Sequence, residues 1–118
     1  MLAADFYIKG KLVAKNVKVC KSFRLKLLGL MFVSSPGNGA FLPDVSSIHM
    51  NFVRFGLRII WLDKEYKVVG QVYAKQWRFY NGPANSAHVL ELPITNKSTV
   101  RLGDRLKVTT HDRKTGSK

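Results

Sequence analysis

The sequence has little of what several classes of protein require. It contains one cysteine, Cys20, so an internal disulfide is excluded. The longest nearly uncharged stretch, 27–53, is interrupted by polar and turn-forming residues, and it cannot supply about twenty apolar residues for a membrane crossing. The first residues lack the basic segment followed by an apolar one that marks a secretory signal. We therefore expect a cytoplasmic protein without a membrane partner.

Motifs for nucleotides and metals are missing as well. Neither Gly-x-x-x-x-Gly-Lys nor Gly-x-Gly-x-x-Gly occurs, so the sequence gives no support for nucleotide hydrolysis or dinucleotide binding. Cys20 and the three histidines show no Cys-x-x-Cys or His-x-x-x-His spacing. We expect no metal and no cofactor.

Positive charge, in contrast, is abundant. Twenty Lys and Arg residues against seven Asp and Glu give a formal net charge of +13. Such an excess favours polyanionic partners, although it says nothing about fold. The segment between Asp5 and Asp44 has no acidic residue, and a second stretch, 75–80, places cations among aromatic rings. The candidate nucleic-acid contacts are Lys9, Lys11, Lys15, Lys18, Lys21, Arg24, Lys26, Lys75, Trp77, Arg78 and Tyr80.

The 118 residues suit one domain, which we expect to span 1–110 and to be followed by a basic, flexible tail at 111–118. Apolar alternation predicts short strands, with 57–62 and 67–74 paired as a hairpin. Ser22 and the apolar spacing after it predict one main helix over about 22–32, and 93–100 has room for a single helical turn. The predicted class is therefore α+β, a β-rich single domain forming a small barrel or half-barrel of mostly antiparallel strands.

Five short motifs, in order and with compatible spacing, resemble a bacterial and archaeal family called domain of unknown function 192. They are Leu28-Gly29-Leu30-Met31, Ser47-Ile48-His49-Met50, the segment 54–63, Val89-Leu90-Glu91-Leu92 and the segment 102–106. The resemblance runs from about Lys15 to Lys107. It implies a barrel-like fold and no defined chemistry. Where the family pattern has Pro and Asp, this sequence has Gly56 and Arg58, so any function of that carboxylate is not carried over.

Polar residues within the apolar strands are the candidate ligand-binding residues: His49, Asn51, Arg58 and Glu91. Alternation places His49 and Asn51 on one face of their strand. Glu91 needs a partner if it is buried, and Arg58 or His49 would serve. The alternative for His49 is a structural role in which a backbone carbonyl holds its ring. For Arg58, the alternative to pairing with Glu91 or another carboxylate is that its head extends into a solvent-filled cleft, where it would hold an anionic ligand.

These observations favour a monomeric, non-enzymatic binding module with a polar pocket near His49, Arg58 and Glu91, occupied by a small ligand or contacted by a protein partner. The alternative is a basic protein that binds single-stranded nucleic acid through the Lys9–Lys26 face and the Lys75–Tyr80 loop. A hydrolase using Cys20 or His49 is the least favoured function, and no residue is assigned a catalytic role.

Overall fold

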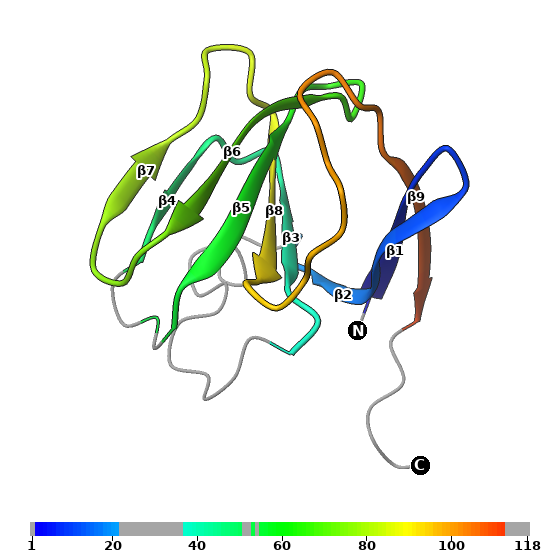
Figure 1. The fold of residues 1–118 in the computed structure, drawn as a ribbon, viewed down its shortest axis with the longest axis horizontal. Helices are drawn as coiled ribbons and strands as arrows, with labels where there is room; N and C mark the ends of the chain where they lie inside the picture. The colour runs from blue at the N-terminus through cyan, green and yellow to red at the C-terminus, as the bar shows by residue number, and fades with distance from the viewer. Residues whose placement is uncertain (1, 22–36, 51–52, 54, 113–118) are drawn as a thin grey trace.

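A computed structural model describes residues 2–21, 37–50, 53 and 55–112. Its strands are β1 (Leu2–Ile8), β2 (Lys11–Val19), β3 (Ala40–Pro43), β4 (Ser47–His49), β5 (Leu57–Leu62), β6 (Val68–Ala74), β7 (Phe79–Asn81), β8 (His88–Pro93) and β9 (Lys107–Asp112). Figure 1 shows β4 and β7 on one side of the central strands β5, β8 and β3, and β1, β2 and β9 on the other side, with a long loop between β8 and β9 crossing beside them.

The predicted α+β class is wrong, because every regular element among the described residues is a strand, and the protein is a β-rich single domain. The helix predicted over about 22–32 falls within 22–36, outside the described residues. The helical turn predicted in 93–100 is replaced by one tight turn followed by extended chain. This segment forms hydrogen bonds with neighbouring strands, and those contacts take the place of bonds within a helix. No described helix is long and apolar enough to cross a membrane.

Seven strands form one sheet in the order β6-β5-β8-β3-β2-β1-β9, and β2 and β3 are its parallel pair. The two edges of the sheet approach each other at one end, where Lys67 and Arg105 form an antiparallel bridge. Next to this bridge, the Leu106 N–H donates to the Tyr66 carbonyl at 2.8 Å. The sheet therefore curls into a half-barrel that is closed at one end. Strands β4 and β7 form a separate two-stranded sheet.

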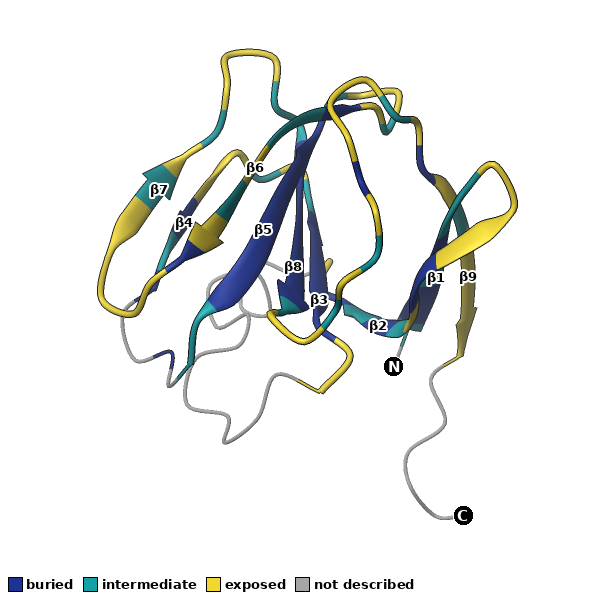
Figure 2. Ribbon diagram, viewed as in Figure 1, coloured by how far each residue is buried: buried dark blue, intermediate teal, exposed yellow. Residues whose placement is uncertain are grey.

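Alternate residues of β5 and β8 face two different hydrophobic clusters, because successive side chains of a strand point to opposite sides of the sheet. Ile60 and Leu90 belong to the interior cluster of the half-barrel, together with residues of β1, β2 and β3. Ile59 and Val89 belong to an outer cluster, which also contains residues next to the small sheet. Both faces of β5 are covered, and Figure 2 shows this strand in the colour of buried residues along its length.

The last strand, β9, pairs with β1 and includes the first two residues of the predicted tail. His111 lies opposite Ala3, and its Nε2 is 3.1 Å from Oδ1 of Asp5. The same carboxylate accepts the backbone N–H of Asn16 at 2.7 Å, and that hydrogen bond is the main cause that lowers the pKa of Asp5. Residues 113–118 lie outside the described part of the chain.

Candidate functional site

Arg58 lies on β5 and faces the interior of the half-barrel, where only 5% of its surface is exposed. Its Nη1 donates to the carbonyl of Asn96 at 3.1 Å and to Oγ of Ser98 at 3.3 Å. Its Nη2 donates to Oε1 of Gln71 at 3.4 Å, whereas Nε is buried without a partner in the described structure. The guanidinium is thus compensated by neutral oxygens, and among the described residues it pairs with no carboxylate and lines no described pocket.

These contacts fix the loop that follows β8 against three strands. The Asn96 side chain donates from Nδ2 to the Val13 carbonyl of β2 at 2.8 Å. Gln71 of β6 donates from Nε2 to the Val100 carbonyl at 2.7 Å. Together with Arg58 of β5, these residues hold the loop across the open side of the half-barrel, between β6 and the strands of the other edge. The buried charge therefore positions a loop.

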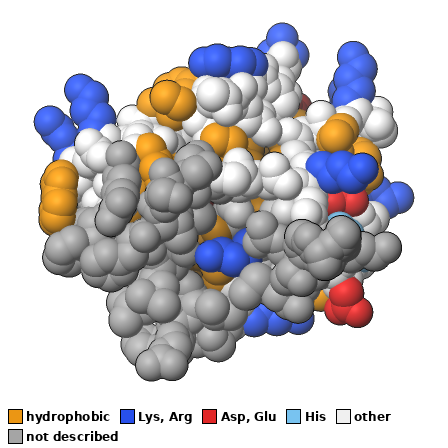
Figure 3. All heavy atoms as spheres, turned by 90° about the horizontal axis from the view of Figure 1, so that it is seen from below, with side chains coloured by type: hydrophobic (Ala, Val, Ile, Leu, Met, Phe, Trp, Pro, Cys, Tyr) orange, Lys and Arg blue, Asp and Glu red, His pale blue; other side chains and the backbone are white. Residues whose placement is uncertain are grey.

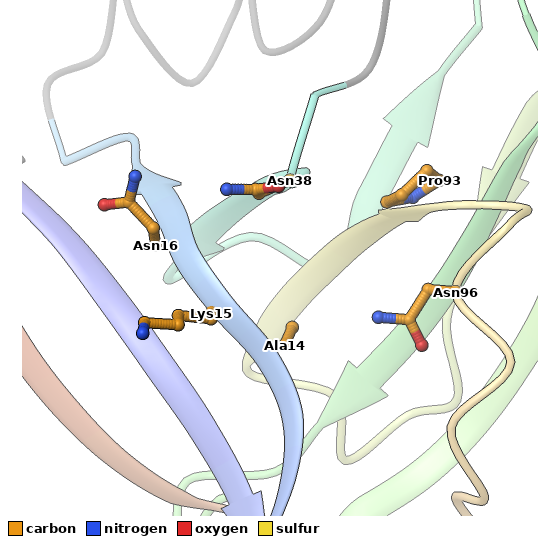
Figure 4. A pocket seen from close by; sticks show the side chains of 6 residues that line it. All are labelled: Ala14, Lys15, Asn16, Asn38, Pro93 and Asn96. Atoms are coloured by element: carbon orange, nitrogen blue, oxygen red, sulfur yellow. The ribbon is translucent and has the colours of Figure 1, made fainter. Parts of the chain in front are cut away.

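A polar pocket of about 420 Å³ lies between β2 and this loop, and Figure 4 shows it from close by. Its lining residues are Ala14, Lys15, Asn16, Asn38, Pro93 and Asn96. In Figure 4 the amide of Asn38 points toward Asn16, and the amide of Asn96 points toward β2. Asn16 has a left-handed backbone, with φ of 55°, that an asparagine tolerates better than most residues. Three asparagines and one lysine therefore line this pocket, and in Figure 4 the Lys15 side chain extends away from Pro93 and Asn96.

Glu91 lies on β8 and faces the outer cluster, on the opposite side of the sheet from Arg58. The register of β5 and β8 pairs Arg58 with Leu92 and Ile59 with Glu91. Since directly paired residues share a face, Glu91 projects with Ile59 and away from the guanidinium. The structure does not bring these two candidate site residues together.

Glu91 is 6% exposed, and the buried Oε1 of its carboxyl has no hydrogen-bond partner among the described residues. Burial raises the pKa of this carboxyl to about 7, and the charge of Lys18 opposes part of that rise. Lys18 lies in the same row of paired residues, because it is opposite Ala40, which in turn is opposite Glu91. The carboxyl therefore takes up a proton near neutral pH.

Cys20 is fully buried at the end of β2 and packs in the outer cluster. Burial raises the pKa of its thiol, and the nearby Glu91 carboxylate adds to this rise while Lys18 opposes it. A thiol that keeps its proton is a poor nucleophile. This environment gives no support for a hydrolase based on Cys20.

His49 lies on β4 opposite Phe79 of β7, away from the interior face that holds Arg58. His49 is half-buried, and its Nδ1 has no hydrogen-bond partner among the described residues, so this ring nitrogen is not bonded to a described backbone carbonyl. Its neighbours Ile48 and Met50 pack in the outer cluster, as alternation predicts. Asn51 lies outside the described residues.

Sequence reasoning missed the residues that hold Arg58 and line the pocket. They are Asn16, Asn38, Gln71, Asn96 and Ser98. The polar segment from Asn96 to Ser98 comes soon after an apolar strand, and this pattern could have marked it as a candidate site. Nothing in the local sequence indicates which strand the segment contacts.

His88 is another buried polar residue that the candidate list did not include. Its Nδ1 accepts the Asp44 N–H at 3.0 Å, and its ring packs beside Phe41 and Tyr66. It has a structural role. Among the described residues, no group of three or more His, Cys, Asp or Glu side chains could hold a metal ion.

The candidate nucleic-acid residues fall on two surfaces. Lys9 and Lys11 flank the turn between β1 and β2 and are exposed, as are Lys15 and Lys21, whereas Lys18 is half-buried. Arg24 and Lys26 lie outside the described residues. The second surface is the loop from β6 to β7, where Lys75, Trp77 and Arg78 are exposed and Tyr80 is half-buried.

Comparisons with known sequences agree with the motif resemblance. The model of the family DUF192, described as "Uncharacterized ACR", matches residues 6–108. The UPF0127 protein of Thermococcus kodakarensis is 33% identical over 92 residues, which cover 73% of this chain and 59% of that protein. The UPF0127 protein of Pyrococcus furiosus is 30% identical over 106 residues, which cover 84% of this chain and 91% of that protein. The chain thus spans about 59% of the Thermococcus relative and nearly all of the Pyrococcus one.

Two solved structures share the fold. A candidate transcription regulator from Sinorhizobium meliloti superposes with a TM-score of 0.78 at 16% identity and covers 92% of this chain and 94% of its own. A protein of unknown function from Novosphingobium aromaticivorans gives a TM-score of 0.74 at 16% identity, with 89% of this chain and 83% of its own covered. At this identity the likeness concerns the fold alone. On the family match and the archaeal relatives, the chain belongs to the uncharacterised DUF192 (UPF0127) family.

Proposed function

We propose that this chain is a non-enzymatic binding module that holds a small polar ligand in the pocket between β2 and the loop after β8. The observation that carries this proposal is the clustering of Lys15, Asn16, Asn38 and Asn96 around a volume of about 420 Å³. None of His49, Arg58 and Glu91 lines this pocket, but Arg58 donates hydrogen bonds to Asn96, which does.

The pocket is built before a ligand arrives, which lowers the entropic cost of binding. Asn96 is fixed from both sides, by Arg58 and by the carbonyl of Val13. Asn16 is held through its backbone N–H by Asp5. The side-chain amides of Asn16 and Asn38 make no hydrogen bond within the described part of the protein, so they are available to a ligand.

The lining residues suggest the class of ligand. An amide side chain both donates and accepts hydrogen bonds, which suits hydroxyl groups, and the exposed Lys15 adds a positive charge at the edge of the pocket. A small polyhydroxylated acid, such as a sugar acid, matches both features. We expect the site to bind such a ligand without changing it, because no histidine, cysteine, serine or carboxylate is among the residues that line the pocket.

A titration followed by nuclear magnetic resonance tests this proposal with three probes: glucuronate, glucose and inorganic phosphate. We expect glucuronate to shift the side-chain amide signals of Asn16 and Asn38 with a Kd of about 1 mM or below, and glucose to bind more weakly. Asn38→Ala should weaken glucuronate binding about tenfold, since it removes a ligand contact without touching the Arg58 cluster.

The matched control is Asn81→Ala, which removes an exposed asparagine on β7, outside the pocket. It should leave glucuronate binding unchanged. The proposal fails if none of the three probes shifts the Asn16 and Asn38 signals, or if phosphate alone does so.

A further inference from the structure

A larger concave surface lies at the end of β6, separate from the polar pocket. It has a volume of about 670 Å³ and lies between the loop that follows β6 and the turn that follows β8. Its side chains of interest are Tyr73, Lys75, Trp77, Arg78, Ile94 and Lys97, and together we call them the aromatic-basic groove. We infer that this groove binds single-stranded nucleic acid, with bases stacked on the rings and phosphates held by the cations.

The rings of the groove are unusually exposed for their size. Tyr73 is 59% exposed and Trp77 is 62% exposed, and Phe79, the first residue of β7, is also exposed close by in the sequence. Large aromatic side chains on one surface mark a site of interaction more often than single exposed apolar residues do. Flat, exposed rings suit the faces of unstacked bases, whereas a protein partner requires closed apolar pockets for its anchor side chains.

The fold holds the loop that presents Trp77. The backbone N–H of Trp77 donates to the Met50 carbonyl at 2.9 Å, and the Met50 N–H donates to the Arg78 carbonyl at 2.7 Å. The Lys75 N–H donates to the hydroxyl of Tyr80 at 2.8 Å, which closes the loop on itself. Trp77 has a φ of 66°, a conformation that a bulky side chain adopts only when its surroundings impose it. Hydrogen bonds therefore hold the backbone of the loop from which the Trp77 ring projects.

The charge of the groove matches a polyanion. Lys75, Arg78 and Lys97 line it, and none of its described lining residues is acidic. In Figure 3 cationic and hydrophobic side chains adjoin at the left of the molecule, while the acidic side chains on this face gather at the right. The aromatic rings can stack on any base, and the cations can neutralise the phosphates of any strand. Together these two features suit binding without sequence preference. A duplex hides its base faces, so the groove should prefer single strands.

Titration of oligo(dT) and oligo(U) of about eight nucleotides, a length typical of one binding site, tests this inference. Tryptophan fluorescence reports on the groove, because Trp77 is exposed whereas Trp61, the second tryptophan, is buried. We expect both oligonucleotides to quench the signal and a duplex of equal length to bind more weakly. Trp77→Ala, measured by anisotropy of a labelled oligonucleotide, should weaken binding about tenfold or more.

Salt dependence separates the groove from the general positive charge. Three neutralised phosphates predict a slope of log K against log salt near −2, and the double variant Lys75→Gln, Arg78→Gln should reduce its magnitude by about 1.4. The matched control is Lys9→Gln, Lys11→Gln, which removes two exposed charges at the turn between β1 and β2. This control should reduce the slope much less. Circular dichroism establishes that each variant is folded.

Three outcomes would overturn the inference: no quenching at about 50 mM salt, an equal loss of affinity in both charge variants with no effect of Trp77→Ala, or competition by polyglutamate as strong as by oligonucleotide. The third outcome would indicate an acidic protein partner. Asn38→Ala should leave oligonucleotide binding unchanged, so this inference and the proposed polar pocket can fail independently.

Discussion

The two faces of the central strands β5 and β8 each bury one charged side chain, and they treat it differently. On the interior face Arg58 donates hydrogen bonds to Asn96, Ser98 and Gln71. On the outer face Glu91 has an oxygen with no partner among the described residues, and its pKa is raised to about 7. Hydrogen bonds stabilise the charged form of Arg58, whereas Glu91 loses its charge by protonation below about pH 7.

The difference reflects what each face offers. A guanidinium needs acceptors, and a loop supplies them readily through carbonyl and hydroxyl oxygens. A carboxylate needs donors, but the backbone N–H groups of a sheet are used in strand pairing, and the described side chains of the outer cluster are apolar, with the charge of Lys18 nearby offsetting only part of the cost of burial. Burial without donors costs more for the charged form than for the neutral form. Arg58 therefore fixes the loop after β8 by hydrogen bonds, whereas the ionised form of Glu91 lowers the stability of the folded protein.

The largest expected effect concerns Glu91 and pH. The folded-state pKa of about 7 lies above the ordinary glutamate value of 4.5, so the folded protein keeps a proton that the unfolded chain has released. The contribution of Glu91 to stability should therefore be greatest below about pH 4.5, fall as the pH rises to about 7, and stay low above it. Glu91→Gln should raise the free energy of unfolding by about 3 kcal/mol at about pH 8 and change it little at about pH 4.5. Urea denaturation at both pH values measures this.

The matched control is Glu65→Gln, which removes an exposed carboxylate 3.7 Å from Arg105. It should change the stability by less than about 1 kcal/mol. A Glu91→Gln protein that is less stable than the unmodified protein at about pH 8 would show that Glu91 is ionised and paired, and the comparison of the two faces would be wrong.

The second prediction concerns Arg58. Arg58→Met keeps much of the apolar stem but leaves the Asn96 carbonyl and its neighbours without their donor. We expect a loss of about 2 kcal/mol in the free energy of unfolding, similar at about pH 4.5 and pH 8. Arg101→Met, at an exposed position in the same loop, is the control and should have little effect. An equal stability of the Arg58→Met and unmodified proteins would mean that the loop does not depend on this contact.

The smallest expected effect is the coupling between the two charges. Because they lie on opposite faces, the effects of Arg58→Met and Glu91→Gln should add in the double variant, within about 0.5 kcal/mol. The same denaturation experiment on four proteins gives this coupling energy. A coupling energy of about 2 kcal/mol or more would indicate that Arg58 and Glu91 form the ion pair suggested by the sequence, and it would contradict the observed register.

Much of the local structure was predictable, because it depends on neighbours in the sequence. Alternation identified the hairpin of β5 and β6, and the structure confirms the pairing of Leu57–Leu62 with the following strand. It also placed Arg58 on the face of Ile60 and Leu62, as observed. The helix predicted over about 22–32 depended on equally local reasoning, but it lies outside the described residues. The predicted α+β class is wrong, because all regular elements among the described residues are strands.

The family membership and the β-rich character followed from the sequence by itself, since motif order and apolar periodicity are properties of the chain. The partners of the buried charges did not. A shift of one residue in the pairing of β5 with β8 would have placed Glu91 on the face of Arg58, and no local pattern specifies that register. Asn96, 38 residues away, became the partner instead, because folding brought its loop across the open side of the half-barrel. Hydrogen bonds between distant segments are decided only when the whole sheet is assembled.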